Sequence, residues 1–156
     1  MNERTAMKFK DKVVLVTGAS RGIGAGIAHA FAAEGATVVV NHVSNAAAAA
    51  EVVAQCQAAG GDAWAVKADV GSALAVQAMV DEIVRETGRI DVVVNNAFRP
   101  YAFDPERRTL FDDIAWPDYQ AQFDGAVGGA FHVCRAVLPQ FRPVSYTHLR
   151  AHETEA

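Results

Sequence analysis

The glycine-rich stretch TGASRGIG (17–24) constrains the fold more than any other part of the sequence. The apolar, β-branched run KVVLVT (12–17) precedes it, and such runs suit strands that are buried on both faces. The segment 22–35 follows with a helical spacing of apolar residues and a glycine where a helix would end. A buried strand, a glycine loop and a helix in this order predict the first unit of a parallel α/β sheet. The apolar residues at helical spacing are Ile23, Ile27 and Phe31.

The same alternation of strand and helix continues along the chain. Further apolar runs predict strands, and segments with helical spacing, several with a capping residue at the start, predict helices. Strands that alternate with helices imply parallel βαβ units with right-handed crossovers. We therefore predict the N-terminal part, about four strands, of a Rossmann-type doubly wound parallel sheet in a three-layer α/β/α arrangement. The predicted strands are 12–17, 37–41, 63–70 and 89–97, and the predicted helices are 22–35, 44–61, 71–88 and 117–141.

Composition and charge exclude several classes of protein. The net charge of −4 comes with no basic cluster, which argues against binding to nucleic acid or to an anionic membrane surface. No apolar run approaches the roughly 20 residues that span a bilayer, and residues 1–10 lack the apolar core of a signal peptide. Cys56 and Cys134 match no metal or redox spacing and are expected to be reduced. These features predict a cytoplasmic location.

The three glycines of the loop have the spacing that a pyrophosphate site requires. Gly18 would allow the turn out of the strand, Gly22 would let a pyrophosphate approach the backbone, and Gly24 would permit close contact between helix and strand. The helix N-terminus then offers free amides and the positive end of its dipole. Three glycines alone also fit a flexible turn, but their place between a buried strand and a helix favours dinucleotide binding.

The end of the second strand indicates which dinucleotide binds. A carboxylate there would bind a ribose 2′-hydroxyl and favour NAD, but this strand ends in Asn41 and His42. Arg21 lies inside the glycine loop, where its guanidinium could pair with a 2′-phosphate. The alternative makes Arg21 a solvated loop cation. The pattern favours NADP (NADPH) over NAD as the cofactor.

These residues together resemble a classical short-chain dehydrogenase/reductase, closest to the 3-oxoacyl-acyl-carrier-protein reductases. The resemblance covers about residues 8–142 and depends on TGASRGIG, on Asp69-Val70, on the NNA at 95–97 and on the long helix ending in RAVLP. It implies a strand order of 3-2-1-4, and a complete protein that is a homo-oligomer, a tetramer or a dimer, in fatty acid metabolism. The cofactor-binding residues that it implies are Gly18, Ser20, Arg21, Gly22, Ile23 and Gly24 for the phosphates, Asp69 and Val70 for the adenine, and Asn95 and Ala97 for the ribose.

Other interpretations of these positions remain open. Asp69 could cap the turn that follows it, and Asn95 could hydrogen-bond across strand ends. Two positions depart from the family pattern: Phe98 stands where a glycine is usual, and Ala126 stands where the family places a catalytic asparagine. Each departure weakens the expectation of a standard proton relay.

The segment VSYTHLR (144–150) imitates a catalytic Ser/Tyr-x-x-x-Lys set, and we reject that interpretation. The family separates its serine from its tyrosine by about a dozen residues, whereas Ser145 and Tyr146 are adjacent, and the cation is Arg150 instead of a lysine. His148 and His152 have helical metal-ligand spacing without the accompanying glutamate, so we predict no metal site. The tail also resembles a translated sequencing adapter, with a natural, divergent C-terminus as the alternative.

The sequence therefore predicts an N-terminal arm (1–10), a partial NAD(P)-binding Rossmann domain (11–142) and a non-native-looking tail (143–156). The resemblance implies an NADP-dependent oxidoreductase that reduces a 3-oxoacyl thioester or a related small carbonyl substrate by hydride transfer. No catalytic residue is assigned, and the chain as given is expected to be inactive. The alternative is a non-catalytic NADP-binding or interaction protein. A plain α/β fragment without a ligand is a third possibility.

Overall fold

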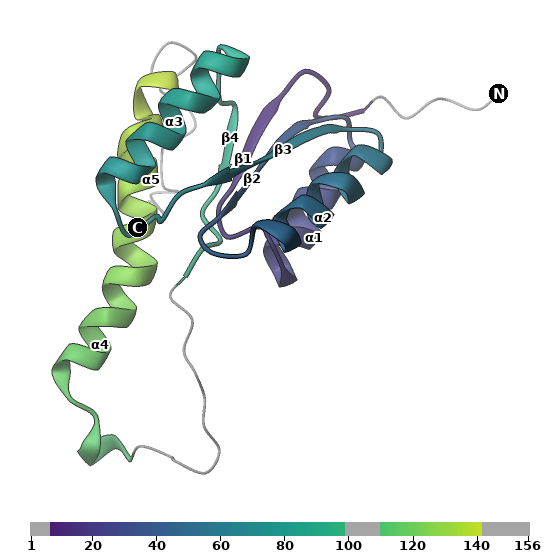
Figure 1. The fold of residues 1–156 in the computed structure, drawn as a ribbon. Helices are drawn as coiled ribbons and strands as arrows, with labels where there is room; N and C mark the ends of the chain where they lie inside the picture. Colours follow the sequence, from purple (N-terminus) through teal and green to yellow (C-terminus); the bar gives the residue numbers. More distant parts are fainter. Residues whose placement is uncertain (1–6, 99–109, 142–156) are drawn as a thin grey trace, which may run out of the picture.

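The computed structural model describes residues 7–98 and 110–141. Four parallel strands form one sheet in the order β3-β2-β1-β4, as predicted (Figure 1). In this order β1 is central and pairs with β2 on one side and with β4 on the other. The strands are β1 (Val13–Val16), β2 (Thr37–His42), β3 (Asp62–Lys67) and β4 (Val92–Val94).

Helices cover both faces of this sheet and make the predicted three layers (Figure 1). α1 (Gly22–Ala33) and α2 (Ala46–Ala58) lie on one face. α3 (Ala73–Thr87) and α5 (Gly129–Phe141) lie on the other. The buried side chains form one apolar cluster on each face, because successive strand residues point to opposite sides. Leu15 and Val39 thus face α3 and α5, while Val38 and Val40 face α1 and α2.

Capping residues determine where α2 and α3 begin and where α3 ends. The Asn45 side chain accepts a hydrogen bond from Ala48 N (3.0 Å) and caps α2. The Ser72 hydroxyl accepts one from Ala75 N (3.3 Å) and caps α3. Gly88 adopts φ 76° and ends α3 in the left-handed conformation that glycine tolerates best.

The buried face of α1 differs from the stripe that the apolar spacing marks. Ile23 is 78% exposed, and the residues that bury against the sheet are Gly24, Ala28 and Ala32. Small side chains let the helix axis approach the strands closely, so here the side chain that packs best is not the most apolar one.

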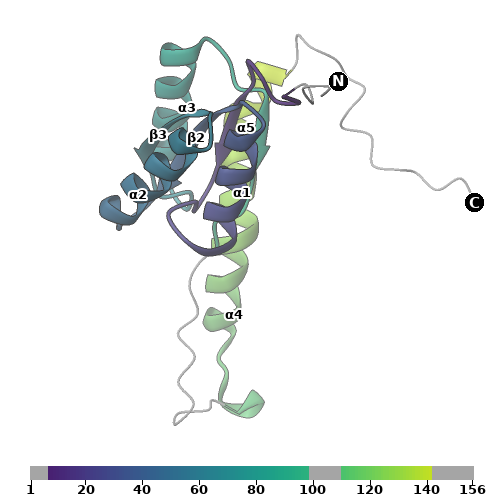
Figure 2. The same ribbon diagram turned by 90° about the vertical axis from the view of Figure 1, so that its right-hand side faces the viewer.

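The predicted helix 117–141 is interrupted in the structure. α4 (Trp116–Phe123) leads into a π-helical turn, η2 (Asp124–Gly128), before α5 begins. α4 projects beyond the sheet along the line of α5 (Figure 2). The apolar residues at helical spacing in this segment form a stripe that is mostly exposed, and Gly129, Val133 and Val137 are buried instead. The exposed members of the stripe are Tyr119, Phe123, Val127, Phe131 and Cys134.

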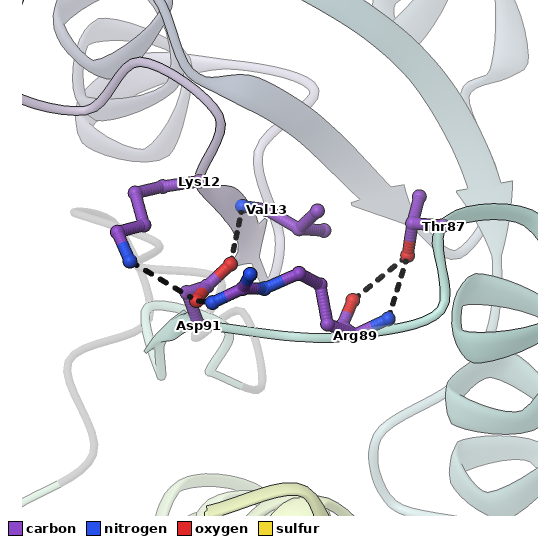
Figure 3. Close-up of polar contacts among 5 residues, drawn as sticks. All are labelled: Lys12, Val13, Thr87, Arg89 and Asp91. Atoms are coloured by element: carbon purple, nitrogen blue, oxygen red, sulfur yellow. Dashed lines mark hydrogen bonds and ion pairs between the residues drawn. The ribbon is translucent and has the colours of Figure 1, made fainter. Parts of the chain in front are cut away.

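The sheet edge at β4 is fixed by a charged cluster at its N-terminal end (Figure 3). The Asp91 carboxylate accepts a hydrogen bond from Val13 N (2.9 Å), and pairs with Lys12 Nζ (3.5 Å) and with the Arg89 guanidinium. Burial raises the pKa of Asp91, but the Val13 N–H and the two cations outweigh it, so the pKa is lowered. The Thr87 hydroxyl and the Arg89 backbone are hydrogen-bonded beside this cluster and hold the chain as it enters β4.

Candidate functional site

The sequence-predicted site residues gather at the carboxyl ends of the parallel strands. The glycine loop follows β1, Asp69 and Val70 follow β3, and the NNA segment follows β4. From β1 the chain continues to β2 and β3 on one side, and then crosses to β4 on the other side of β1. The strand order therefore reverses between β1 and β4. Ligands of open α/β sheets bind at this switch point.

The glycine loop approaches its neighbours too closely for side chains at two positions. A Cβ added to Gly18 (φ 61°) would lie 3.0 Å from Ala97 Cα. A Cβ added to Gly24 would lie 2.5 Å from Asn96 Nδ2 and 2.7 Å from Gly18 O. Gly22 adopts φ 58° with open space around it, so its backbone is exposed to an approaching group. The three glycines therefore have three different local geometries: a turn at Gly18, an open backbone at Gly22 and close packing at Gly24.

The N-terminus of α1 has no side-chain cap, unlike those of α2 and α3. Arg21 occupies the cap position in an extended conformation and makes no capping hydrogen bond. Asn45 and Ser72 occupy the same position on α2 and α3 and do accept one. The amides of the first turn of α1 and the positive end of its dipole are therefore available to an anion.

The polar residues Thr17 and Asn96 join the glycine loop to the end of β4, and sequence reasoning missed both. The Thr17 hydroxyl donates to Val94 O (3.2 Å) and accepts from Asn96 N and Ala97 N (both 3.0 Å). Asn96 Nδ2 donates to Thr17 O (2.9 Å) and Gly18 O (3.2 Å). The second asparagine of NNA thus makes the hydrogen bonds across strand ends that the sequence suggested for the first.

Asn95 points toward α5, where its Nδ2 donates to Cys134 Sγ (3.3 Å). Ala97 lies against Gly18, and Phe98 is exposed at the end of the described segment. Ala126 falls inside η2, and wide turns of this kind often occur at functional sites. Its methyl group has no hydrogen-bond donor or acceptor, so it cannot do the work of the asparagine that the family resemblance implies at this position.

The loop after β3 is held by its own turn and by α5. Asp69 Oδ1 accepts from Gly71 N (2.8 Å), which confirms that Asp69 caps the following turn. His132 Nδ1 lies 3.0 Å from Val70 O. A Cβ on Gly129 would lie 2.8 Å from Val70 Cγ2, so α5 can contact this loop only because residue 129 is glycine. Asp69 and Val70 are thus held beside the carboxyl end of the sheet.

The end of β2 carries the residues that bear on the choice of cofactor. His42 is only 6% exposed, and its Nδ1 is buried with no hydrogen-bond partner among the described residues. It follows Gly24 by 18 positions, about where dinucleotide folds place the residue that reads the ribose 2′ position. Arg21 is exposed at the glycine loop and Ser20 is half-buried beside it. Tyr146, His148 and His152 lie outside the described residues.

Within residues 7–98 and 110–141, no three His, Cys, Asp or Glu side chains gather as a metal site would require. None of the helices in these ranges is long and apolar enough to cross a membrane. Burial raises the pKa of the Cys56 thiol, which lies in α2 away from the glycine loop.

The chain is similar in sequence to known oxidoreductases. A model of the short chain dehydrogenase family matches residues 12–146. The chain is 52% identical over 129 residues to an uncharacterized oxidoreductase of Methylorubrum extorquens (83% of this chain, 50% of that protein). It is 43% identical over 126 residues to a 3-oxoacyl-[acyl-carrier-protein] reductase of Synechocystis sp. (81% and 49%). It is 41% identical over 114 residues to a hydroxynaphthalene reductase of Aspergillus fumigatus (73% and 41%).

Solved structures agree with the sequence relatives. An NAD⁺-bound xylitol dehydrogenase matches with a TM-score of 0.75 at 36% identity, covering 86% of this chain and 49% of that one. A metagenomic short-chain oxidoreductase in complex with NADP matches with a TM-score of 0.74 at 29% identity, covering 85% and 57%. The chain spans about half the length of the curated relatives it matches. The parallel sheet, the glycine loop before α1 and the match over residues 12–146 show that the chain belongs to the short chain dehydrogenase family.

Proposed function

We propose that this chain is the cofactor-binding half of an NADP(H)-dependent short-chain oxidoreductase. The observation that carries the proposal is the uncapped N-terminus of α1, which follows a loop that only glycine can form. The residues fit the pyrophosphate of a dinucleotide: Gly22 leaves the backbone open, and no side chain competes for the first-turn amides. A bound nicotinamide would supply hydride to a carbonyl carbon in the complete protein.

Arg21 and His42 support NADP over NAD. Arg21 stands at the cap of α1 with its guanidinium in the solvent-exposed part of the loop. β2 ends in His42, so no carboxylate is there to accept a ribose 2′-hydroxyl or to repel a 2′-phosphate. Guanidinium groups form strong, often bidentate hydrogen bonds with phosphate.

The substrate class that we propose is a 3-oxoacyl thioester or a related carbonyl. The sequence resemblance and the 43% identical reductase of Synechocystis sp. support it. The similar proteins also include a hydroxynaphthalene reductase, whose name indicates a substrate of another shape. A complete protein of this class would be a homo-oligomer in the cytoplasm.

The first experiment measures binding to the 156-residue chain. Adenosine 2′,5′-bisphosphate should bind at least about tenfold more tightly than adenosine 5′-monophosphate, because a paired phosphate contributes a charge-assisted hydrogen bond. Arg21→Ala should remove that preference, and the exposed, distant Arg85→Ala should leave it unchanged. Equal affinities for the two nucleotides in the wild-type chain would contradict the NADP assignment.

His42→Asp tests the same assignment in the opposite direction. A carboxylate at the end of β2 should weaken the bisphosphate and favour a free ribose 2′-hydroxyl, so the order of the two affinities should reverse. An unchanged order would show that the end of β2 does not read the 2′ position.

Ala126 favours a second candidate, a non-catalytic NADP-binding or interaction protein. The family places a catalytic asparagine at this position, and the alanine in η2 offers no donor. Both candidates predict that the chain binds NADPH, and we expect no turnover of a 3-oxoacyl thioester by the chain as given. Turnover that is abolished by Tyr146→Phe would overturn that expectation.

A further inference from the structure

Asn41 is a fully buried polar residue (0% exposed) at the carboxyl end of β2, outside the motifs that mark the family. The three residues before it, Val38, Val39 and Val40, are buried and apolar, as in a strand covered on both faces. An asparagine in such a strand is costly unless its side chain is hydrogen-bonded. Its contacts therefore indicate why it is there.

The Asn41 side chain joins two loops that approach β2 from opposite sides. Its Oδ1 accepts a hydrogen bond from Gly18 N (3.1 Å), at the start of the glycine loop. Its Nδ2 donates to Ala68 O (3.0 Å) and Val66 O (3.4 Å), immediately before Asp69. Carbonyl groups surround the nitrogen and an N–H faces the oxygen, so this orientation of the amide is the one that satisfies every partner.

The backbone of the same residue extends this connection. Asn41 O accepts from Ala19 N (2.9 Å), so two consecutive amides of the glycine loop, those of Gly18 and Ala19, bond to one residue. On the other side, His42 O accepts from Ala68 N (3.0 Å). A valine at position 41 would keep the backbone bonds but leave Gly18 N–H and Ala68 O without their side-chain partner, at the cost of desolvated polar groups.

These contacts complement those that Asn96 makes from the other side of β1. Asn96 holds Thr17 O and Gly18 O from the end of β4, and Asn41 holds Gly18 N from the end of β2. Of these two asparagines, only Asn41 also bonds to the chain at the end of β3. Fully satisfied buried networks of this kind fix one arrangement of the groups that they join.

We propose that Asn41 is a positioning residue that fixes the glycine loop and the loop after β3 relative to each other. The proposal rests on the proposed function, which assigns the phosphates of the cofactor to the first loop, and on the family resemblance, which implies that the adenine lies at the second. Asn41 touches neither part of the ligand. It sets the distance between the two subsites, so that one dinucleotide can occupy both.

The test compares Asn41→Ala with Val39→Ala in the 156-residue chain. Val39 is the matched control, because it lies two residues earlier on the same strand, is equally buried, and contacts the apolar cluster instead of the loops. Hydrogen exchange in the free protein should show faster exchange of the Gly18 amide in Asn41→Ala only, because Ala19 N–H bonds to the backbone carbonyl that every variant retains. Binding of adenosine 2′,5′-bisphosphate should weaken about tenfold in Asn41→Ala and less than about twofold in Val39→Ala.

Asn41→Asp is a second variant that conserves side-chain volume. It keeps the acceptor for Gly18 N–H and removes both donors toward β3, so Gly18 should stay protected while the amides of residues 68–70 exchange faster. Equal exchange and equal affinity in Asn41→Ala and Val39→Ala would overturn the proposal. A wild-type chain that does not bind the nucleotide would overturn the proposed function and the cofactor part of this inference together, whereas the exchange pattern would still decide whether Asn41 fixes the loops.

Discussion

Gly24→Ala is expected to destabilise the chain although alanine is the better helix former. The added methyl carbon would lie 2.5 Å from Asn96 Nδ2, 2.7 Å from Gly18 O and 3.0 Å from Ala19 Cα. Two of these neighbours belong to the backbone of the glycine loop and cannot move without moving the turn. The third would have to leave its hydrogen bonds to Thr17 O and Gly18 O.

The magnitude follows from three effects. Overpacking costs about 1–3 kcal/mol, and loss of the Asn96 hydrogen bonds costs about 1–3 kcal/mol more. Replacing glycine inside a helix returns about 1 kcal/mol. Together these effects give an expected net loss of about 1–5 kcal/mol in the free energy of unfolding, a large part of the stability of an ordinary domain.

Gly26→Ala is the matched control, because it lies in the same helix and a Cβ there meets nothing within 4 Å. It should gain about 0.5–1 kcal/mol from helix propensity alone. Urea unfolding followed by circular dichroism measures both variants, and they should differ in opposite directions from the wild type. If the two variants shift equally, then close packing at Gly24 does not determine the geometry of the loop.

Three further variants test other parts of the structure. Arg21→Asp should stabilise the chain by about 1 kcal/mol by capping α1, yet abolish binding of adenosine 2′,5′-bisphosphate; a variant that still binds would show that α1 does not hold the phosphates. Asp91→Asn should cost about 1–3 kcal/mol at pH 7. Because the pKa of Asp91 is lowered in the folded chain, the wild type should lose this advantage as the pH falls from about 4 through that pKa. Urea unfolding at several pH values between 7 and 3 should therefore show a free energy of unfolding that depends less on pH in the variant than in the wild type. The wild-type chain should self-associate through its exposed apolar stripe, and Phe123→Lys with Phe131→Lys should reduce light scattering; a wild type that is monomeric at high concentration would refute this.

The sequence was sufficient to predict the alternation of strands and helices as far as β4. Strand composition, cap residues and glycines act locally, so the order of elements and the starts of α2 and α3 follow from neighbouring residues alone. The helical period was a weaker guide to the buried face. α1 buries Gly24, Ala28 and Ala32 because a close approach to the sheet favours small side chains, and this depends on the distance between elements, which the sequence pattern does not contain.

The break in the predicted long helix has a similar origin. Gly125, Gly128 and Gly129 are poor helix formers, but nothing in their spacing separates a wide turn from a regular one. Gly129 is required for a tertiary reason, the contact with Val70, and Val70 precedes it by 59 positions. Only the packing of α5 against the loop after β3 makes that glycine necessary.

The polar residues that build the site show most clearly where sequence reasoning stops. Asn95 and Asn96 are identical and adjacent, yet one side chain points to Cys134 on α5 and the other to the glycine loop. Side chains alternate along an extended chain, so a shift of one position decides which asparagine holds the loop. The role of Asn41 is harder still to predict, because the sequence pattern shows only that the end of β2 has no acidic residue. Its role becomes visible when β1 and β3 are placed on either side of it, and this arrangement makes a residue outside the family motifs the link between the glycine loop and the loop after β3.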